Sequence, residues 1–588
     1  MGILAQVAAA AEKHHTFVES QVREARTNAK SRDRLLSRWT AIKAAIPITV
    51  TPTGLKLPRL ALPDIDDAGE IARYLFGEGL PGEFPFLSAA YPQMYLEPLP
   101  LNGKTPKDKT EEPTRLFAGL GIPQDTNARF HYLTKHQRSA RLSTAFDGPT
   151  LYGIDSDADG VFGKIGEGGV AVDTVDDMVR LFDGFDLASE QTSVSMTING
   201  PAPTILAMFV AAAKRRFGDD VVARLRGTIQ ADILKEVQAQ NEMLFPIEAS
   251  LRFLTDMVEW TTGNMPRWYP ISISGYHIAE AGATPVQQAA YTLSNGFTYA
   301  ELFRARGMDV NRFGPRLSFF LDCGLEVEYL ALARVCRKLW AIGMRDIFGA
   351  EPRAQILKLH TQTSGRSLVA HTFKNNLTRT AVELMLSYIN ATNSCHSNSA
   401  DEPFTTPGEE YVKLAANAQA IILEESGVFK HMMNSLGSSP GIKAAERAVE
   451  AAILEEFRQI DQLGGVLAAV EHRYQRSQIQ TAAHHYERQI YDKTRPVVGL
   501  NCYRDQAQAP EVSLVRTSIA HRKLQVDRVA NFKRRHRKDG PAALDRLAEV
   551  VENGGNVFGE LIETVERCSL GQITERLQEA VGKYRPTI

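Results

Sequence analysis

Residues 193–200 read SVSMTING, a strand-like run in which small polar residues alternate with apolar ones and which ends in Asn-Gly. Similar runs, each followed by a longer helical pattern such as 285–306, 326–347 or 375–390, recur along the middle of the chain. The eight runs are LFAGLG (116–121), RLSTAFDG (141–148), SVSMTING (193–200), RGTIQADI (226–233), PISISGYH (270–277), RLSFFLDCG (316–324), ILKLHTQTSG (356–365) and NSCHSNSAD (393–401). Strand-helix units spaced by about 40 residues predict an α/β fold, a (β/α)8 TIM barrel, with function at the C-terminal strand ends.

One face of several predicted strands is small and polar. The residues are Ser193, Ser195, Thr197 and Asn199, then Ser272 and Ser274, and either Thr361 and Thr363 or His360, Gln362 and Ser364. An ordinary barrel of this kind fills its interior with Val, Ile and Leu. The polar side chains could instead point outward, but that face packs on helices and should be apolar. We therefore expect a polar-lined axial tunnel that admits a long, thin, polar ligand.

The composition is that of an ordinary globular protein. The chain has 588 residues, 44% of them hydrophobic and 23% charged, and a formal net charge of -2. That charge gives no overall field for nucleic acid or a membrane surface, and no apolar run reaches the roughly 18 residues of a membrane helix. We therefore expect neither nucleic acid nor a membrane as a partner. The basic stretch 521–540 is expected to be a solvated helix facing another subunit.

The five cysteines are widely spaced and form no CxxC motif. Neither a disulfide framework nor a cysteine-based metal site is predicted, and no other metal site is expected. The N-terminal MGILAQVAAAAEKHH lacks the basic leading segment of a signal peptide and is interpreted as the start of a helix. These features fit a reducing cytoplasm.

The pattern divides the chain into four parts. Residues 1–46 predict an N-terminal helical segment, and residues 47–113 a proline-rich, extended arm wrapped over the core. Residues 114–425 hold the barrel. Residues 426–588 predict a C-terminal helical region, interrupted by a linker at 494–512.

The strand ends carry eight motifs that together resemble one family. They are FAGLG (117–121), STAFDGPTLYGIDSD (143–157), SMTINGPAPTILA (195–207), RGTIQADILKE (226–236), SISGYHIAEAGA (272–283), PRLSFF (315–320), HTQTSG (360–365) and CHSNSADE (395–402). In this order they resemble the methylmalonyl-CoA mutase family of adenosylcobalamin enzymes, from about residue 80 to the C-terminus. The resemblance implies that acyl-CoA threads the barrel axis. It also implies a radical isomerase, in which cobalt-carbon homolysis starts a reaction that moves the thioester carbonyl.

The resemblance also assigns roles to individual residues. His277 matches the histidine that hydrogen-bonds the thioester carbonyl, and Tyr276 the tyrosine against substrate and adenosyl group. Residues matching contacts to CoA or the acyl group are Arg115, Thr228, Gln230, Arg316 and Ser318. Residues matching the cofactor side are Asn398 and Glu402 near the adenosyl ribose, and Gln362 and Gly119 facing the corrin. Read without the resemblance, a lone histidine at a strand end is more often structural. Tyr276 could be an aromatic core residue, and each of the others could cap or stabilise a loop.

Two positions bear on the substrate. Where methylmalonyl-CoA mutases have a tyrosine and an arginine that pairs with the substrate carboxylate, this chain has Phe117 and Gln240. A carboxylate buried without that arginine would cost several kcal/mol. The pair resembles the branch that interconverts isobutyryl-CoA and n-butyryl-CoA. Alternatives are pivalyl-, isovaleryl-, 2-hydroxyisobutyryl- or methylmalonyl-CoA as substrate, or a non-catalytic scaffold homologue paired with an active chain.

The family's cobalamin-binding domain carries DxHxxG, whose histidine ligates cobalt, and this sequence has no such motif. We expect adenosylcobalamin to be held mainly by a separate small subunit, and the family implies an α2β2 assembly. A GxxxxGK[ST] loop is also missing from the sequence, so any G-protein chaperone is expected to be a separate protein.

Overall fold

The computed structural model describes residues 2–96, 114–137, 139–504 and 514–586. Each of the eight predicted runs contains a strand. The strands are β3 (Leu116–Ala118), β4 (Ala140–Ala145), β5 (Thr192–Thr197), β6 (Gly227–Ile229), β7 (Trp268–Tyr269) with β8 (Ile271–Ser274), β9 (Leu317–Cys323), β10 (Lys358–Thr363) and β11 (Ser394–His396). β7 lies just before the run 270–277, and Pro270 separates it from β8 because proline has no N–H to donate to a neighbouring strand.

The strands form two parallel sheets in which neighbours in space are neighbours in sequence. One sheet has the order β3-β4-β5-β6-β7 and the other β11-β10-β9-β8. Backbone hydrogen bonds also link the sheets at both edges: Arg115 N–H donates to Cys395 O (3.2 Å), and Ser272 N–H donates to Gln230 O (2.9 Å). The architecture is therefore mixed α/β, with the carboxyl ends of all these strands on one side.

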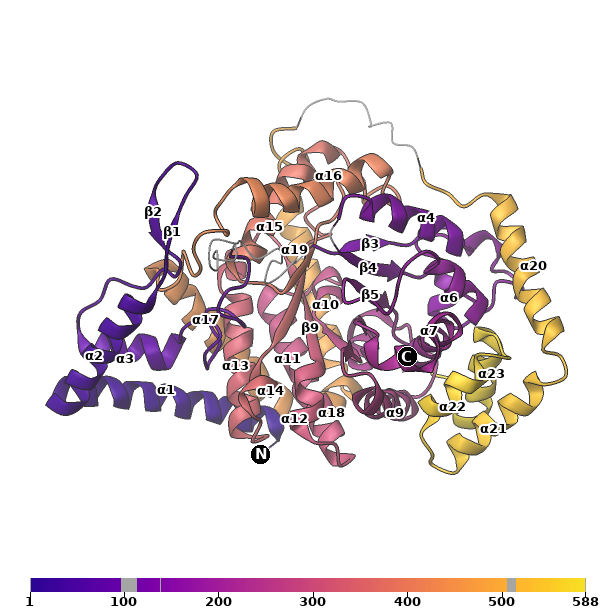
Figure 1. The fold of residues 1–588 in the computed structure, drawn as a ribbon, viewed down its shortest axis with the longest axis horizontal. Coiled ribbons are helices and arrows are strands. Elements are labelled where there is room, and N and C mark those ends of the chain that lie inside the picture. Colours follow the sequence, from indigo (N-terminus) through magenta and orange to yellow (C-terminus); the bar gives the residue numbers. More distant parts are fainter. Residues whose placement is uncertain (1, 97–113, 138, 505–513, 587–588) are drawn as a thin grey trace.

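Helices connect successive strands and surround them (Figure 1). The longer ones are α4 (Pro123–Thr134), α6 (Val175–Leu181), α7 (Ala202–Phe217), α9 (Ile247–Asn264), α11 (Pro285–Ala305), α13 (Leu332–Asp346) and α15 (Asn376–Ile389). Parallel strands require such crossovers, because a short hairpin cannot bring the chain back to the same end of the sheet.

Burial alternates along β5 and β10, as expected for strands with one polar face, whereas β8, with Ser272 and Ser274, is buried throughout. In β5, Val194 and Met196 are buried in the main hydrophobic core, whereas Ser195 on the opposite face is only half-buried. In β10, Lys358, His360 and Gln362 are half-buried, while the alternating Leu359, Thr361 and Thr363 are buried. Of the two alternatives for this strand, the polar face is therefore the one with His360 and Gln362.

The N-terminal part is more folded than the sequence suggested. Helices α1 (Ile3–Thr27) and α2 (Ala29–Ala45) are followed by an antiparallel hairpin of β1 (Ile48–Val50) and β2 (Lys56–Pro58). Next come α3 (Ala68–Arg73) and the π-helical turn η1 (Tyr74–Glu78). The prediction of an extended arm is wrong for this stretch, because residues 68–78 contain no proline and Asp67 caps the helix. The rest of the predicted arm, 97–113, lies outside the described residues.

The C-terminal part is helical in its described residues, from α16 (Glu409–Ala420) and the π-helical turn η8 (Ile421–Glu425) onward. The remaining helices are α17 (Pro440–Gln462), α18 (Val466–Glu471), α19 (Tyr474–Tyr491), α20 (Ile519–Arg535), α21 (Gly540–Glu552), α22 (Val557–Thr564) and α23 (Leu570–Val581). Part of the predicted linker, 505–513, lies outside the described ranges. In those ranges, no helix combines the length and apolarity needed to cross a lipid bilayer.

The sequence predicted a solvated helix at 521–540 that faces another subunit, but the corresponding helix α20 forms ion pairs with its own chain. Its cations pair with carboxylates of the same chain: Arg522 with Glu167 (2.5 Å), and Arg535 with Asp176 (2.5 Å). Lys533 similarly pairs with Asp157 (2.7 Å). The carboxylates are distant in sequence, so the basic run could not reveal that α20 is held against its own chain.

Candidate active site

Tyr276 and His277 begin the short helix α10 (Tyr276–Glu280), directly after β8. The preceding Gly275 is required by close packing, since a Cβ there would lie 2.3 Å from Oγ1 of Thr292. The Tyr276 ring stacks on Phe320 of β9, with ring centroids 4.9 Å apart and planes 5° apart. His277 meets the same phenylalanine edge-on at 5.8 Å. Phe320 therefore supports both residues predicted to be catalytic.

Gln362 of β10 joins this pair to the next strand. Its Nε2 donates to the Tyr276 hydroxyl (3.0 Å) and to Oδ1 of Asn398 (2.8 Å), which follows β11. The Asn398 backbone N–H donates to Oγ1 of Thr363 (2.8 Å). Burial and the nearby carboxylates of Glu280 and Glu402 raise the pKa of Tyr276 well above its ordinary value, so its phenol stays neutral. The neighbouring strands β8, β9, β10 and β11 thus bring together Tyr276, Phe320, Gln362 and Asn398.

His277 is held as a neutral imidazole. Burial, followed by the nearby Lys235 cation, lowers the pKa of His277 well below its ordinary value. In the part of the chain that the structure describes, its buried Nδ1 has no hydrogen-bond partner. A buried nitrogen left unpaired costs stability, which makes it a candidate to hydrogen-bond a ligand.

Asn398 and Glu402 form the rim beside Tyr276. Asn398 is buried, and its Nδ2 has no partner among the described residues. The Glu402 carboxylate accepts the Ser399 N–H (2.8 Å), but burial outweighs this bond and raises the pKa of Glu402 to about 8. A free amide donor beside a protonated carboxyl suits the hydroxyls of a ribose, so these residues fit the adenosyl group that the sequence implied.

Several of the other predicted ligand contacts lie on the polar strand face. Arg115 donates to Ser195 Oγ (2.7 Å) across β4, and the Phe117 ring lies 5.2 Å from that of His396. Thr228 of β6 pairs in register with Ser195 and is half-buried. Gln230 is buried, donates to Ser274 Oγ (2.8 Å) and accepts from Asn199 (3.1 Å). The residues form a polar strip beside the catalytic candidates.

Gln240 ends the π-helical turn η4 (Glu236–Gln240), after the short helix α8 (Ile233–Lys235). Its Oε1 accepts from Nζ of Lys235, which is fully buried and forms an ion pair with Glu236 (2.5 Å). Because the ammonium group only donates, it fixes the Gln240 amide with its oxygen toward Lys235 and leaves Nε2 for another acceptor. The Lys235 charge is already matched by Glu236. π-helical turns are frequent at functional sites.

Three predicted residues lie apart from this group. Arg316 directly precedes β9, at its N-terminal end, and donates to the carbonyls of Arg312 (3.2 Å) and Met265 (2.9 Å). Ser318 donates to Ile271 O (3.0 Å). A Cβ on Gly119 would lie 2.1 Å from Ala145 O, so packing against β4 explains this glycine without a ligand.

Sequence reasoning missed Phe320, Lys235 and a carboxylate pair. Phe320 shares the strand face of Ser318, and this spacing within PRLSFF was the available signal. Glu280 accepts the Gly365 N–H (2.7 Å), and Asp322 accepts the Tyr329 hydroxyl (2.6 Å). Burial, then Glu280, raises the pKa of Asp322 to about 7. Across the described ranges, His, Cys, Asp and Glu form no group of three able to hold a metal.

The parallel α/β fold gathers this cluster of polar and aromatic side chains at the carboxyl ends of its strands. The family described as methylmalonyl-CoA mutase matches residues 59–583, and the chain belongs to this family. It is 44% identical over 560 residues to the fused isobutyryl-CoA mutase of Nocardia farcinica, covering 91% of this chain and 51% of the relative. It is also 43% identical over 564 residues to the fused isobutyryl-CoA mutase of Geobacillus kaustophilus, and this match covers 91% of this chain and 51% of the relative.

A third relative matches along most of its own length. The 2-hydroxyisobutanoyl-CoA mutase large subunit of Aquincola tertiaricarbonis is 36% identical over 514 residues, which cover 87% of this chain and 88% of the relative. In contrast, the chain spans about half the length of the fused relatives. The similarity thus covers the acyl-CoA mutase family domain.

Proposed function

We propose that this chain is the acyl-CoA-binding part of an adenosylcobalamin-dependent mutase that interconverts isobutyryl-CoA and n-butyryl-CoA. The observation that carries the proposal is the uncharged character of the two positions that bear on the substrate, Phe117 and Gln240. Phe117 is apolar, Gln240 is neutral, and the Lys235 cation beside Gln240 is paired with Glu236. An additional buried carboxylate would find no unmatched cation in this trio. The names of the fused relatives support the same substrate.

The proposal includes a closed eight-stranded barrel with a polar axial tunnel. Its support is the pair of backbone hydrogen bonds between the sheet edges and the polar strip on one strand face. Arg316 and Ser318 would lie along the CoA chain toward the N-terminal strand ends, with the thioester reaching His277 at the other end. Thr228 and Gln230 would contact the ligand between these ends.

In this mechanism, the neutral His277 donates an N–H hydrogen bond to the thioester oxygen as the carbonyl migrates. Tyr276, held by Phe320 and Gln362, covers the reacting carbons and excludes water. Adenosylcobalamin, when bound, supplies a 5'-deoxyadenosyl radical by homolysis of its cobalt-carbon bond. Asn398 and Glu402 would hold the ribose of that group, with Gln362 and Gly119 on the corrin side.

We further propose that cobalamin is held mainly by a separate small subunit in an α2β2 assembly. The support is the printed name "large subunit" of the relative that this chain matches nearly end to end. The fused relatives favour the opposite arrangement, in which one polypeptide binds both acyl-CoA and cobalamin. A G-protein chaperone would likewise be separate. The five unpaired cysteines fit a cytoplasmic location.

Product analysis tests the substrate assignment. The chain is mixed with its small subunit, adenosylcobalamin and, separately, isobutyryl-, pivalyl-, 2-hydroxyisobutyryl- and methylmalonyl-CoA. Conversion of isobutyryl-CoA to n-butyryl-CoA, with none from methylmalonyl-CoA, is the expected result. Preferential turnover of methylmalonyl-CoA would overturn the argument from Phe117 and Gln240. Failure to turn over any acyl-CoA while binding no cofactor would identify a scaffold homologue.

A further inference from the structure

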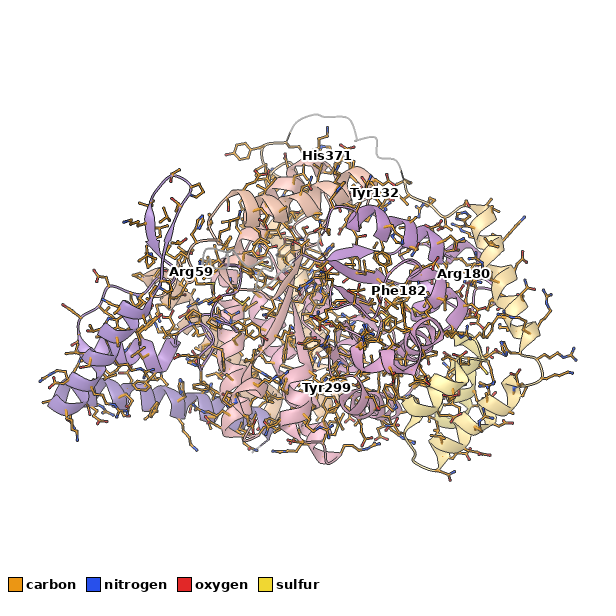
Figure 2. The ribbon with its side chains drawn as sticks, viewed as in Figure 1. Arg59, Tyr132, Arg180, Phe182, Tyr299 and His371 are labelled. Atoms are coloured by element: carbon orange, nitrogen blue, oxygen red, sulfur yellow. The ribbon has the colours of Figure 1, made fainter. Side chains whose placement is uncertain are left out.

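A hollow lies between α6 and α20, lined by none of the residues assigned to catalysis. Its volume is about 540 Å³, within the range of small-molecule pockets. The lining residues are Thr174, Asp176, Arg180, Arg528, Asn531, Arg534 and Arg535. Arg180 lies on the side of α6 that faces α20 (Figure 2). Four arginines therefore surround a hollow that contains one carboxylate.

Two of these arginines keep their charge available. Arg535 pairs with Asp176 (2.5 Å) and Arg180 with Asp177 (3.2 Å). Arg528 instead donates to the neutral amide oxygen of Gln124 (2.8 Å), and Arg534 to that of Asn531. Among the described residues, neither Arg528 nor Arg534 forms an ion pair with a carboxylate. The cavity thus holds a positive excess that an anion would neutralise.

The shape of the charged surface favours a small ligand over a nucleic acid. Arg522 and Lys533 on the same helix are paired with carboxylates of the body, so α20 carries no continuous basic stripe for a polymer backbone. The excess charge is confined to one hollow. Arginine guanidinium groups match phosphate oxygens in geometry and hydrogen-bonding capacity, and Asn531 and Thr174 add neutral polar groups.

We propose that the cavity between α6 and α20 binds the phosphate groups of a small molecule, with Arg528 and Arg534 as its principal ligands. Such a ligand would add a second link between α20 and α6, beside the ion pair of Arg535 with Asp176, by neutralising the remaining arginine charges. This site is independent of the acyl-CoA site and of the reaction proposed above.

Isothermal titration calorimetry on the full chain tests the proposal. Inorganic pyrophosphate, ATP and GTP serve as probes, in the presence of saturating acyl-CoA so that the acyl-CoA site is occupied. The double variant Arg528→Gln/Arg534→Gln should weaken binding at least about tenfold, because each lost charge-assisted hydrogen bond is worth more than a neutral one. Arg537→Gln/Lys538→Gln removes the same charge from exposed positions outside the cavity and should leave binding unchanged.

The probes separate the possible sources of the phosphate. Equal binding of pyrophosphate and nucleotides would assign the site to phosphate groups alone, and tighter binding of one nucleotide would assign it to that class. Absence of binding by the native chain, or equal losses in the two double variants, would overturn the proposal. Circular dichroism of the variants confirms that they are folded.

Discussion

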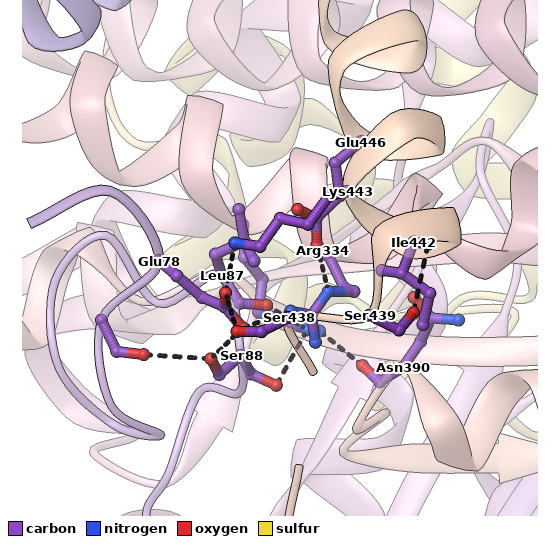
Figure 3. A network of polar contacts seen from close by, with 12 residues as sticks. Glu78, Leu87, Ser88, Arg334, Asn390, Ser438, Ser439, Ile442, Lys443 and Glu446 are labelled. Carbon is purple, nitrogen blue, oxygen red and sulfur yellow. Dashed lines mark hydrogen bonds and ion pairs between the residues drawn. The ribbon is translucent and has the colours of Figure 1, made fainter. Parts of the chain in front are cut away.

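Two clusters of buried polar groups in this molecule have opposite character. The scaffold network consists of Glu78, Arg334, Ser438, Lys443 and Glu446, and it connects the N-terminal part to α13 and α17 (Figure 3). The site network consists of Tyr276, His277, Gln362, Asn398 and Glu402. Arg334 donates to Glu78 (3.0 Å) and Glu446 (2.6 Å), and Lys443 also pairs with Glu78. Every charge in the scaffold network thus has an opposite partner.

The carboxyl groups show the consequence of this difference. Burial alone would raise the pKa of Glu78, but the nearby charges of Lys443 and Arg334 outweigh it and hold that pKa below its ordinary value. Glu402 is penalised by burial without a cation to compensate, and its pKa rises to about 8. The scaffold network is satisfied by the protein itself, whereas the site network is left to be satisfied by ligands.

Breaking the scaffold network should give the largest effect. Arg334→Met leaves Glu78 and Glu446 with less compensation in a buried setting, and we expect unfolding free energy to fall by about 3–5 kcal/mol. Chemical denaturation measures the change. Arg458→Met, which removes exposed ion pairs with Glu12 and Glu455, is the control and should cost about 1 kcal/mol or less. Similar losses of unfolding free energy in the two variants would show that the scaffold network contributes no more to stability than exposed ion pairs do.

Removing His277 should lower activity with little loss of stability, the opposite of what is expected for Arg334→Met. His277→Ala is expected to lower kcat for acyl-CoA isomerisation about 100- to 1000-fold, because a donor to the developing oxygen charge is lost. Stability should change by no more than about 1 kcal/mol, since the buried Nδ1 has no partner to lose. His472→Ala, at an exposed position, is the matched control. A stable but fully active His277→Ala protein would contradict the assigned role.

Glu402→Gln should remove a pH dependence of stability. The folded-state pKa of Glu402 lies above its unfolded value, so the native carboxyl binds its proton more tightly. Its contribution is fully present below about pH 4.5 and is lost as pH rises toward 8, by at most about 1.4 kcal/mol per pH unit. Denaturation of both proteins from pH 5 to 8 measures the difference. Parallel curves over this window would show that the carboxyl ionises normally.

Phe320→Leu should give the smallest effect. Loss of the stacked contact with Tyr276 removes about 0.5–1.5 kcal/mol of orienting interaction, and we expect kcat to fall up to about tenfold with little change in KM. Phe319→Leu on the opposite, core-facing side of β9 is the control, and it should reduce stability but not kcat. If the two variants affect kcat equally, Phe320 does not position Tyr276.

The sequence by itself determined the strand runs, their order and the family. These are local or periodic features: the alternation of polar and apolar residues in SVSMTING, the helical pattern between runs, and motifs such as SISGYH and HTQTSG. It also identified Tyr276, His277, Gln362 and Asn398, which the structure brings together, although their chemical roles stay predictions.

Only the tertiary structure decided which groups are partners across long separations. It joined Arg334 to Glu78 over 256 residues, placed Phe320 against both Tyr276 and His277, and set α20 against carboxylates that precede it by more than 340 residues. It also showed that the less buried face of β10 carries His360 and Gln362. The physical reason is that pairing, burial and pKa depend on neighbours in space, which no local pattern of residues specifies.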